Sequence, residues 1–267
     1  IPPAPPSKPV GEHDAGAATR LSAVDELHIA ASKRWTLRQS LKASIMGDSE
    51  AAHFARRLLT VLNVEITSPT AGVPRFFIDN RGSLLSITDE RGYTVREPRI
   101  WLLLTRCLVE DGQRNFYVPY HAPAGIDVIA HDLNTAVYRT GDSRLIPLPL
   151  LDGAAAAAII LHTMSHIGRS LNTFLSRIPE LVSVSAQIPI KSSRARMMDA
   201  LSCSIQSEPT AAQGAEFRNE KGVVRVRPSA SSQELRIYAE ASRAEIAAEL
   251  CEDFERRIKL LDSSDGK

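Results

Sequence analysis

Apolar side chains recur along this chain at two spacings, and each spacing predicts one kind of element. From Asp48 onward a capping residue precedes apolar residues three and four positions apart, which predicts a helix over 49–63. The alternating run 64–67 that follows predicts a short strand. The preceding segment, 41–46, fits a strand or a helix. The first structured unit is therefore expected to contain a helix followed by a strand.

Three further short runs predict a β-meander. They cover 75–78, 83–88 and 93–95. The segments between them read Asp-Asn-Arg-Gly at 79–82 and Asp-Glu-Arg-Gly at 89–92, and these residue types favour tight turns.

The middle of the chain alternates between the two periods. The expected elements are a helix at 100–112, a strand at 115–120, a helix at 124–133, a strand at 135–138, and helices at 152–168 and 170–178. A strand, a helix and a second strand in this order form a βαβ unit, so this region is predicted to be α/β.

Residues 182–190 alternate as in a strand, the last element of the unit 97–190. The rest of the chain predicts a compact α+β module. Its expected elements are a helix at 192–204, a linker, strands at 215–219, 222–227 and 234–239, and an amphipathic helix at 243–261.

Residues 1–18 are rich in proline and lack hydrophobic periodicity, which predicts a disordered tail or an interdomain linker. The expected units are then 19–96, 97–190 and 191–267. Because the chain opens inside a proline run and without an initiator Met, we expect it to be part of a longer protein.

Composition and charge exclude several classes of function. The chain has 267 residues, 43% of them hydrophobic, and 32 Lys and Arg against 31 Asp and Glu give a net charge of +1. Such a balance does not attract nucleic acid. The longest apolar stretch has eight residues, at 154–161, where a membrane span needs about 20, so we expect a soluble, cytoplasmic protein. Three widely spaced cysteines do not form a zinc site or a redox pair.

Several segments, in the right order, resemble the α-D-phosphohexomutases, the phosphomannomutase and phosphoglucomutase superfamily. The segment 223–241 resembles the strand, phosphate loop and strand of that family's last domain, and 76–95 resembles part of its second domain. Landmarks of the third domain are matched at 115–120, 137–142 and 152–154.

The resemblance implies an α/β fold: two successive mixed-sheet α/β domains followed by a small α+β domain. These would correspond to the family's second, third and fourth domains, without the first. The arrangement looks closest to the mutase-like tails of sugar-nucleotidyltransferases.

A phosphohexomutase needs a phosphoserine, a Mg²⁺ ion, a carboxylate that holds sugar hydroxyls and a cationic phosphate loop. The family's serine lies in a Thr-x-Ser-His loop, and this chain has Thr-Met-Ser-His at 163–166. Because these residues continue the helix that begins near 154, we expect Ser165 to be a helical side chain. No catalytic residue is predicted.

The metal loop of the family carries three aspartates, and here Asp79, Arg81 and Ser83 fall at their positions. One carboxylate beside a cation does not make a dedicated Mg²⁺ site, so no cofactor is expected and Asp79 is interpreted as a turn residue. The sugar loop has no counterpart between 139–144 and Pro147.

The phosphate loop is the best preserved feature. Arg227, Ser229 and Ser231 present a guanidinium and two hydroxyls on a turn between strands, groups suited to a phosphate oxyanion. The family's Gly, Glu and Pro have become Ala230, Ser232 and Gln233, so this loop predicts either weak phosphate binding or a purely structural hairpin. The histidines, His121 among them, are interpreted as structural or surface residues.

These observations favour a catalytically degenerate phosphohexomutase-like module of carbohydrate metabolism. Inactive alone, it would act by regulation, by assembly or by weak binding of a hexose phosphate. Two alternatives stay open. The chain is part of an active mutase or nucleotidyltransferase whose catalytic domain lies upstream, or it is a structural module for self-association.

Overall fold

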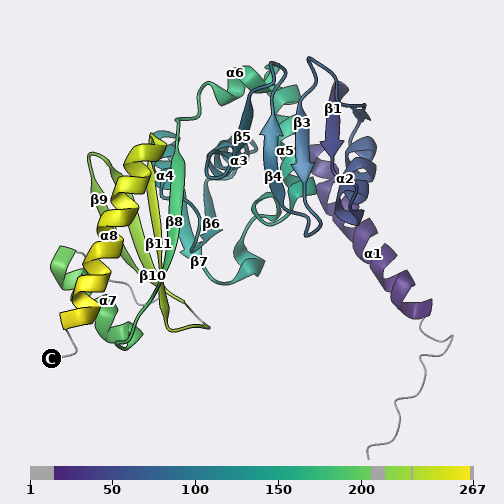
Figure 1. The fold of residues 1–267 in the computed structure, drawn as a ribbon. Coiled ribbons are helices and arrows are strands. Elements are labelled where there is room, and N and C mark those ends of the chain that lie inside the picture. Colours follow the sequence, from purple (N-terminus) through teal and green to yellow (C-terminus); the bar gives the residue numbers. More distant parts are fainter. Residues whose placement is uncertain (1–14, 206–213, 230, 265–267) are drawn as a thin grey trace, which may run out of the picture.

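The computed structural model describes residues 15–205, 214–229 and 231–264. The elements form a curved arrangement in which a five-stranded sheet with α2 and a four-stranded sheet with α8 lie at opposite ends (Figure 1). The two-stranded sheet β6–β7 lies between them. The fold is mixed α/β with several sheets, which confirms the predicted class.

The first sheet has the order β2-β1-β3-β4-β5. Its elements are β1 (Leu41–Met46), α2 (Glu50–Val61), β2 (Val64–Ile66), β3 (Arg75–Ile78), β4 (Leu84–Thr88) and β5 (Thr94–Arg96). The segment 41–46 is thus a strand, because it pairs in parallel with both β2 and β3. The predicted helix and meander are present, and Ser49 caps α2 by accepting a hydrogen bond from the Ala52 amide at 3.2 Å.

The middle of the chain follows the predicted order. It contains α3 (Arg99–Glu110), β6 (Asn115–Pro119), α4 (Gly125–Asp132), β7 (Ala136–Thr140), the short 3₁₀ turns η3 (Ser143–Leu145) and η4 (Leu148–Leu150), α5 (Gly153–Ile167) and α6 (Leu171–Leu175). Its sheet is the single parallel pair β6–β7, rather than a mixed sheet.

Helix α5 lies at the centre of the larger core. Its residues from Gly153 to Leu161 are all buried, and one hydrophobic cluster extends from Trp35 to Ile178. At its first turn the Gly153 amide donates to the Gly82 carbonyl at 2.7 Å, and a Cβ at Gly153 would lie 2.6 Å from the same oxygen. The predicted units 19–96 and 97–190 therefore share one core, held together by α5.

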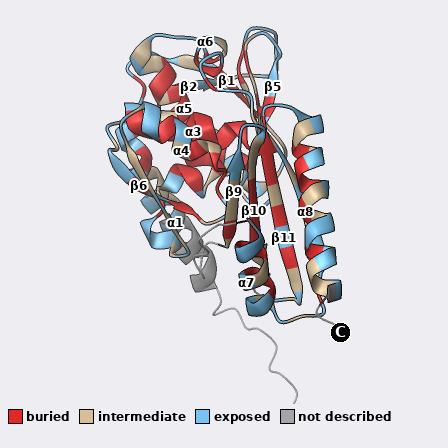
Figure 2. Cartoon of the chain, turned by 90° about the vertical axis from the view of Figure 1, so that its left-hand side faces the viewer, coloured by how far each residue is buried: buried red, intermediate tan, exposed pale blue. Residues whose placement is uncertain are grey.

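The C-terminal sheet is antiparallel, with the order β8-β11-β10-β9 and a core of its own. Its elements are β8 (Val182–Pro189), α7 (Arg194–Ile205), β9 (Ala215–Asn219), β10 (Gly222–Pro228), β11 (Glu234–Ala241) and α8 (Ala244–Ser264). Helix α8 covers one face of this sheet, and its buried residues face the strands (Figure 2).

Two predicted boundaries need correction. The strand at 182–190 was placed with the unit 97–190, but β8 pairs with β11 along its whole length and belongs to the C-terminal sheet. Alternation identifies a strand without identifying its partner. Residues 15–18 were placed in the tail, but the helix α1 (Ala15–Ser32) begins at Ala15. The remainder of the tail, 1–14, and most of the predicted linker, 206–213, lie outside the described residues.

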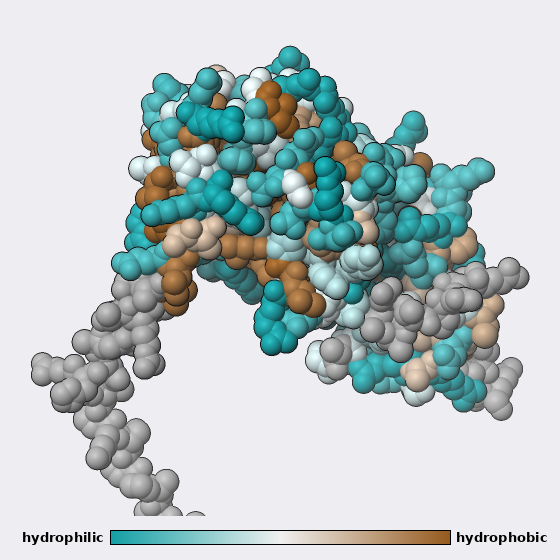
Figure 3. Space-filling model, turned by 180° about the vertical axis from the view of Figure 1, so that it is seen from behind, coloured by the Kyte–Doolittle hydropathy of each residue, from teal (hydrophilic) through white to brown (hydrophobic). Residues whose placement is uncertain are grey.

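Helix α1 was not predicted, because its apolar residues do not gather on one face. Its C-terminal half contacts the body through Asp25 and Arg57, 2.9 Å apart, and through His28 and Asp152, 3.6 Å apart. Seen from behind, the surface is largely hydrophilic, and hydrophobic groups gather in a band along the lower edge of the larger unit (Figure 3). In the described part of the chain, no helix is long and apolar enough to cross a membrane.

Candidate functional site

A cleft of about 720 Å³ separates the C-terminal sheet from the middle of the chain. One wall comes from the start of α3 and the loop after β6, and the other comes from strands β8, β10 and β11. Its lining residues are Glu97, Pro98, Trp101, His121, Pro123, Ser183, Ser185, Arg227, Pro228, Ser229, Ser231, Arg236, Tyr238 and Glu240.

Strand alternation makes the cleft wall polar. Along β11 the buried residues Leu235, Ile237 and Ala239 belong to the C-terminal core, while Arg236, Tyr238 and Glu240 line the cleft. The antiparallel register places Arg227 of β10 directly opposite Arg236. Because successive side chains of a strand point to opposite faces, one face packs against the helices and the other presents charge.

The two arginines differ in their surroundings. The guanidinium of Arg227 lies 5.1 Å from the ring centroid of Tyr120, and partial burial lowers the pKa of Arg227. Arginine still carries its charge at neutral pH. Arg236 is exposed, and it forms no ion pair with any of the described residues. The cleft wall therefore presents two cations side by side.

Ser229 and Ser231 both line the cleft, but they are not equivalent. Ser229 is buried, its amide donates to the Glu234 carbonyl at 2.9 Å, and its hydroxyl accepts from the Ser232 hydroxyl at 2.7 Å. The Arg194 side chain also donates to the Ser229 carbonyl. Ser231 is exposed to the cleft, and Ala230 between the two serines lies outside the described residues. Ser229 thus holds the loop together, and Ser231 is the more accessible hydroxyl.

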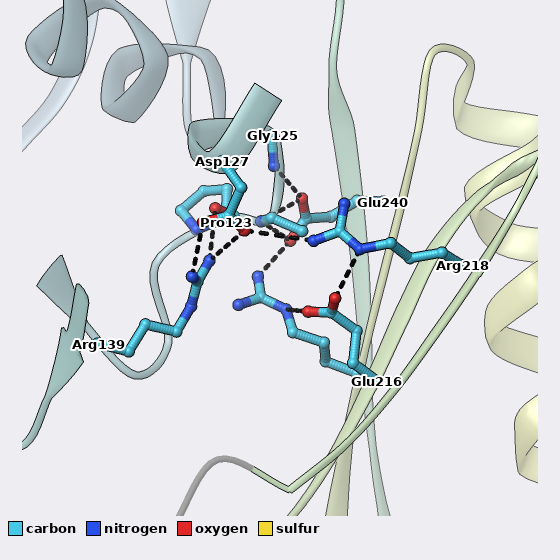
Figure 4. A network of polar contacts seen from close by, with 9 residues as sticks. Pro123, Gly125, Asp127, Arg139, Glu216, Arg218 and Glu240 are labelled. Carbon is cyan, nitrogen blue, oxygen red and sulfur yellow. Dashed lines mark hydrogen bonds and ion pairs between the residues drawn. The ribbon is translucent and has the colours of Figure 1, made fainter. Parts of the chain in front are cut away.

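Glu240 joins the C-terminal sheet to helix α4 (Figure 4). Its carboxylate accepts hydrogen bonds from the Ala124 amide at 2.8 Å and from the Gly125 amide at 3.3 Å, at the helix N-terminus. Arg225 donates to the same carboxylate at 2.6 Å, and both side chains are buried. A cation and a helix N-terminus therefore neutralise Glu240, so that its negative charge opposes anion binding in the cleft only weakly.

A second group of charges extends this junction. Asp127 of α4 accepts two hydrogen bonds from Arg139, at 2.8 and 3.0 Å, and one from Arg218 at 3.3 Å. Arg218 also donates to Glu216 at 2.6 Å. The C-terminal sheet is thus tied to the middle of the chain by a continuous polar network (Figure 4).

Ser165 and Asp79, which match positions of the family's serine and metal loops, form hydrogen bonds within the fold. Ser165 lies in α5, as its periodicity predicts, and its hydroxyl donates to the Gln39 carbonyl at 3.3 Å. The Asp79 carboxylate accepts from the amides of Arg81 and Ser83 at 2.9 and 2.8 Å, which is the geometry of a turn residue. Among the described residues no three His, Cys, Asp or Glu side chains gather as metal ligands. This donor set does not fit the family's Mg²⁺.

Sequence reasoning did not single out Arg236 as a site residue, and on the opposite wall of the cleft it also missed Trp101 and His121. Their rings meet edge to face with centroids 5.8 Å apart, and the Trp101 indole donates to Glu97 at 2.8 Å. The surrounding protein removes part of the hydration of His121 and lowers its pKa, and the positive charges of Arg227 and Arg225 act in the same direction. No motif marks either residue, because each reaches the cleft only through the fold.

Comparison with known proteins agrees with this architecture. Residues 184–257 match the family model described as the C-terminal domain of phosphoglucomutase/phosphomannomutase. This range includes most of β8, in agreement with the sheet pairing. A search of curated proteins found none that matches the chain.

Solved structures show the same fold over most of the chain. A phosphoglucomutase/phosphomannomutase family protein from Burkholderia thailandensis matches with a TM-score of 0.66 and 13% identity, over 89% of this chain and 64% of that one. The N-acetylphosphoglucosamine mutase of Aspergillus fumigatus matches with a TM-score of 0.56 and 12% identity, over 88% and 64%. The chain thus spans 64% of the length of these structures. The chain has the fold of these phosphohexomutase structures, and residues 184–257 match the model of the phosphoglucomutase/phosphomannomutase C-terminal domain.

Proposed function

We propose that this chain is a phosphohexomutase-like module that binds a phosphate monoester, such as a hexose phosphate, and does not catalyse phosphoryl transfer by itself. The main support for this proposal is the position of Arg227 and Arg236, which lie opposite each other on the wall of the cleft. Like charges directly opposite on paired strands repel each other, and an anion between them removes that repulsion.

The polar groups around the pair favour a phosphate. Ser231 adds an exposed hydroxyl, and Glu240, the carboxylate of the C-terminal sheet that lines the cleft, is already paired with Arg225. Among the fold relatives, the Aspergillus fumigatus mutase has been solved with GlcNAc-6P and magnesium. A phosphorylated sugar is therefore the first ligand class to test.

The absence of turnover is inferred from the engaged side chains. Ser165 lies on a helix that contributes no residue to the cleft lining, and Asp79 holds a turn. Neither a phosphorylated nucleophile nor a metal-bound charge is then available to transfer a phosphoryl group. The module would act by regulation or assembly, with the phosphate ester as its signal.

The direct test is calorimetric titration of the chain with glucose 6-phosphate. Arg236→Gln is expected to weaken binding at least about tenfold, since it removes a charge-assisted contact. Arg243→Gln removes an equal charge outside the cleft and serves as the matched control. Equal affinity of the two variants would contradict the assigned site. Conversion of glucose 1-phosphate to glucose 6-phosphate by the chain with Mg²⁺ would contradict the absence of turnover.

A further inference from the structure

A second pocket, of about 250 Å³, adjoins the cleft. Glu97, Trp101 and His121 line both spaces, so the pocket opens where the two aromatic rings meet. Apart from these shared residues, its walls are mainly apolar, with Leu84 from β4, Ile100 and Leu104 from α3, and Pro149, Leu150 and Leu151 from the segment before α5.

The apolar wall is held in place by local structure. In the turn η4 the Leu150 amide donates to the Pro147 carbonyl at 2.9 Å, and the Asp152 amide donates to the Leu148 carbonyl at 3.0 Å. The Asp152 carboxylate at the pocket rim accepts from the Ala155 amide at 2.7 Å and lies 3.6 Å from His28. Hydrogen bonds therefore fix the shape of this pocket wall, and the Asp152 carboxylate at its edge already interacts with Ala155 and His28.

The cleft and pocket together have an ionic end and an apolar end. Arg227 and Arg236 stand in the larger space, and the leucines of α3 and η4 lie beyond Trp101 and His121. An apolar wall offers few partners to hydroxyl groups, so a hydroxyl-rich ring placed there would lose its hydrogen bonds with water. An apolar group placed there would be favoured by its removal from water.

We propose that the ligand of this site is an amphipathic phosphate ester, with the phosphate beside Arg227 and Arg236 and an aryl or short alkyl substituent in the pocket bordered by Leu104 and Leu151. This inference rests on the proposed function and narrows its ligand class. The volume is adequate, because a cavity of roughly 150 Å³ accommodates benzene.

The test compares three probes on the full chain: inorganic phosphate, glucose 6-phosphate and phenyl phosphate. Trp101 borders both spaces, whereas the other tryptophan, Trp35, is buried in the core, so tryptophan fluorescence reports on occupancy alongside calorimetry. Phenyl phosphate is expected to bind at least about tenfold more tightly than glucose 6-phosphate.

Two variants with substitutions at exposed leucines test whether the preference for phenyl phosphate arises in the pocket. Leu151 lines the pocket and is 47% exposed, so Leu151→Ser is expected to abolish the preference for phenyl phosphate and to leave the affinity for inorganic phosphate unchanged. Leu145 is 51% exposed on the same connection and lines neither the cleft nor the pocket, so Leu145→Ser is the matched control. Thermal unfolding of both variants checks that they fold.

The outcomes separate this inference from the proposed function. If inorganic phosphate binds but phenyl phosphate binds no more tightly than glucose 6-phosphate, the assignment of an apolar substituent to the pocket is wrong. The proposed binding of phosphate then still holds. If none of the three probes binds, the proposed function fails, and the ligand class fails with it. An equal loss of preference in Leu151→Ser and Leu145→Ser would overturn the placement of the substituent.

Discussion

Arg227 and Arg236 lie directly opposite each other on neighbouring antiparallel strands, and both line the cleft beside Trp101 and His121. A sheet that served only as a scaffold would gain stability from an opposite charge or an apolar side chain at one of these positions. The proposed anion in the cleft would account for the paired cations.

The first prediction is that repulsion between Arg227 and Arg236 destabilises the ligand-free chain. Arg236→Gln should stabilise the ligand-free chain by about 0.2–1 kcal/mol, because it removes the repulsion from Arg227. Inorganic phosphate should stabilise the wild-type chain by about 2.7 kcal/mol at a hundredfold excess over its Kd, and should stabilise the variant much less. Urea unfolding with and without phosphate measures both effects. A ligand-free variant less stable than wild type would contradict the repulsion.

The second prediction concerns the junction between the C-terminal sheet and α4. Glu240→Gln should destabilise the chain by about 3–5 kcal/mol, since it removes the buried carboxylate 2.6 Å from Arg225 and leaves only Glu216, at 4.0 Å, to pair with that guanidinium. Glu249 forms a similar pair with Lys221 on the surface, with both side chains more than half exposed, so Glu249→Gln should cost less than about 1 kcal/mol. Chemical denaturation distinguishes the two, and similar costs would show that the buried pair is not critical.

The third prediction concerns pH. Burial lowers the pKa of His121 below its ordinary value of 6.5, so the folded chain binds this proton less readily than the unfolded chain does. This contribution to stability is complete above the unfolded pKa and is lost as the pH falls below about 6.5. His121→Asn should therefore reduce the loss of stability on acidification.

The matched control for this pH effect is His131→Asn, because the His131 side chain is 92% exposed. Unfolding free energies between pH 5 and pH 8 provide the comparison. If His131→Asn flattened the profile as much as His121→Asn, the burial of His121 would not be its cause.

The fourth prediction compares two turns of similar sequence. Asp79 and Asp89 each accept two amide hydrogen bonds from their own turns, but Asp89 is buried and its second oxygen also accepts from Asn172 at 3.0 Å. Asp79→Ala should cost about 1 kcal/mol and Asp89→Ala about 3 kcal/mol. Denaturant titrations of the two variants test this order.

The same pair of variants tests the interpretation of Asp79 as a turn residue rather than a metal ligand. Mg²⁺ should leave the unfolding temperature of the wild-type chain unchanged, since the donor set around Asp79 contains one carboxylate. A rise in Tm with Mg²⁺ that disappears in Asp79→Ala would reveal a metal site instead.

Much of the local structure follows from sequence patterns. The helix α2, the meander of β3, β4 and β5, and the position of Ser165 on α5 were predicted, because periodicity and turn residues act over a few positions. Helix α1 was not predicted, since its apolar residues do not gather on one face, and its contacts with the rest of the chain, such as His28 with Asp152, are visible only in the fold.

The sequence by itself determined that 223–241 forms two strands around a loop with Arg227, Ser229 and Ser231, since side chains alternate and turn residues interrupt them. Only the tertiary structure decided that β8 joins this sheet and that the Ser229 hydroxyl is hydrogen-bonded to Ser232 within the loop. It also decided that Trp101 and His121 line the same cleft as the two arginines. The physical reason is distance along the chain. Arg227 and Arg236 lie more than 100 residues after Trp101 and His121 in the sequence, and packing, including the contact of Glu240 with the start of α4, brings the two cleft walls together.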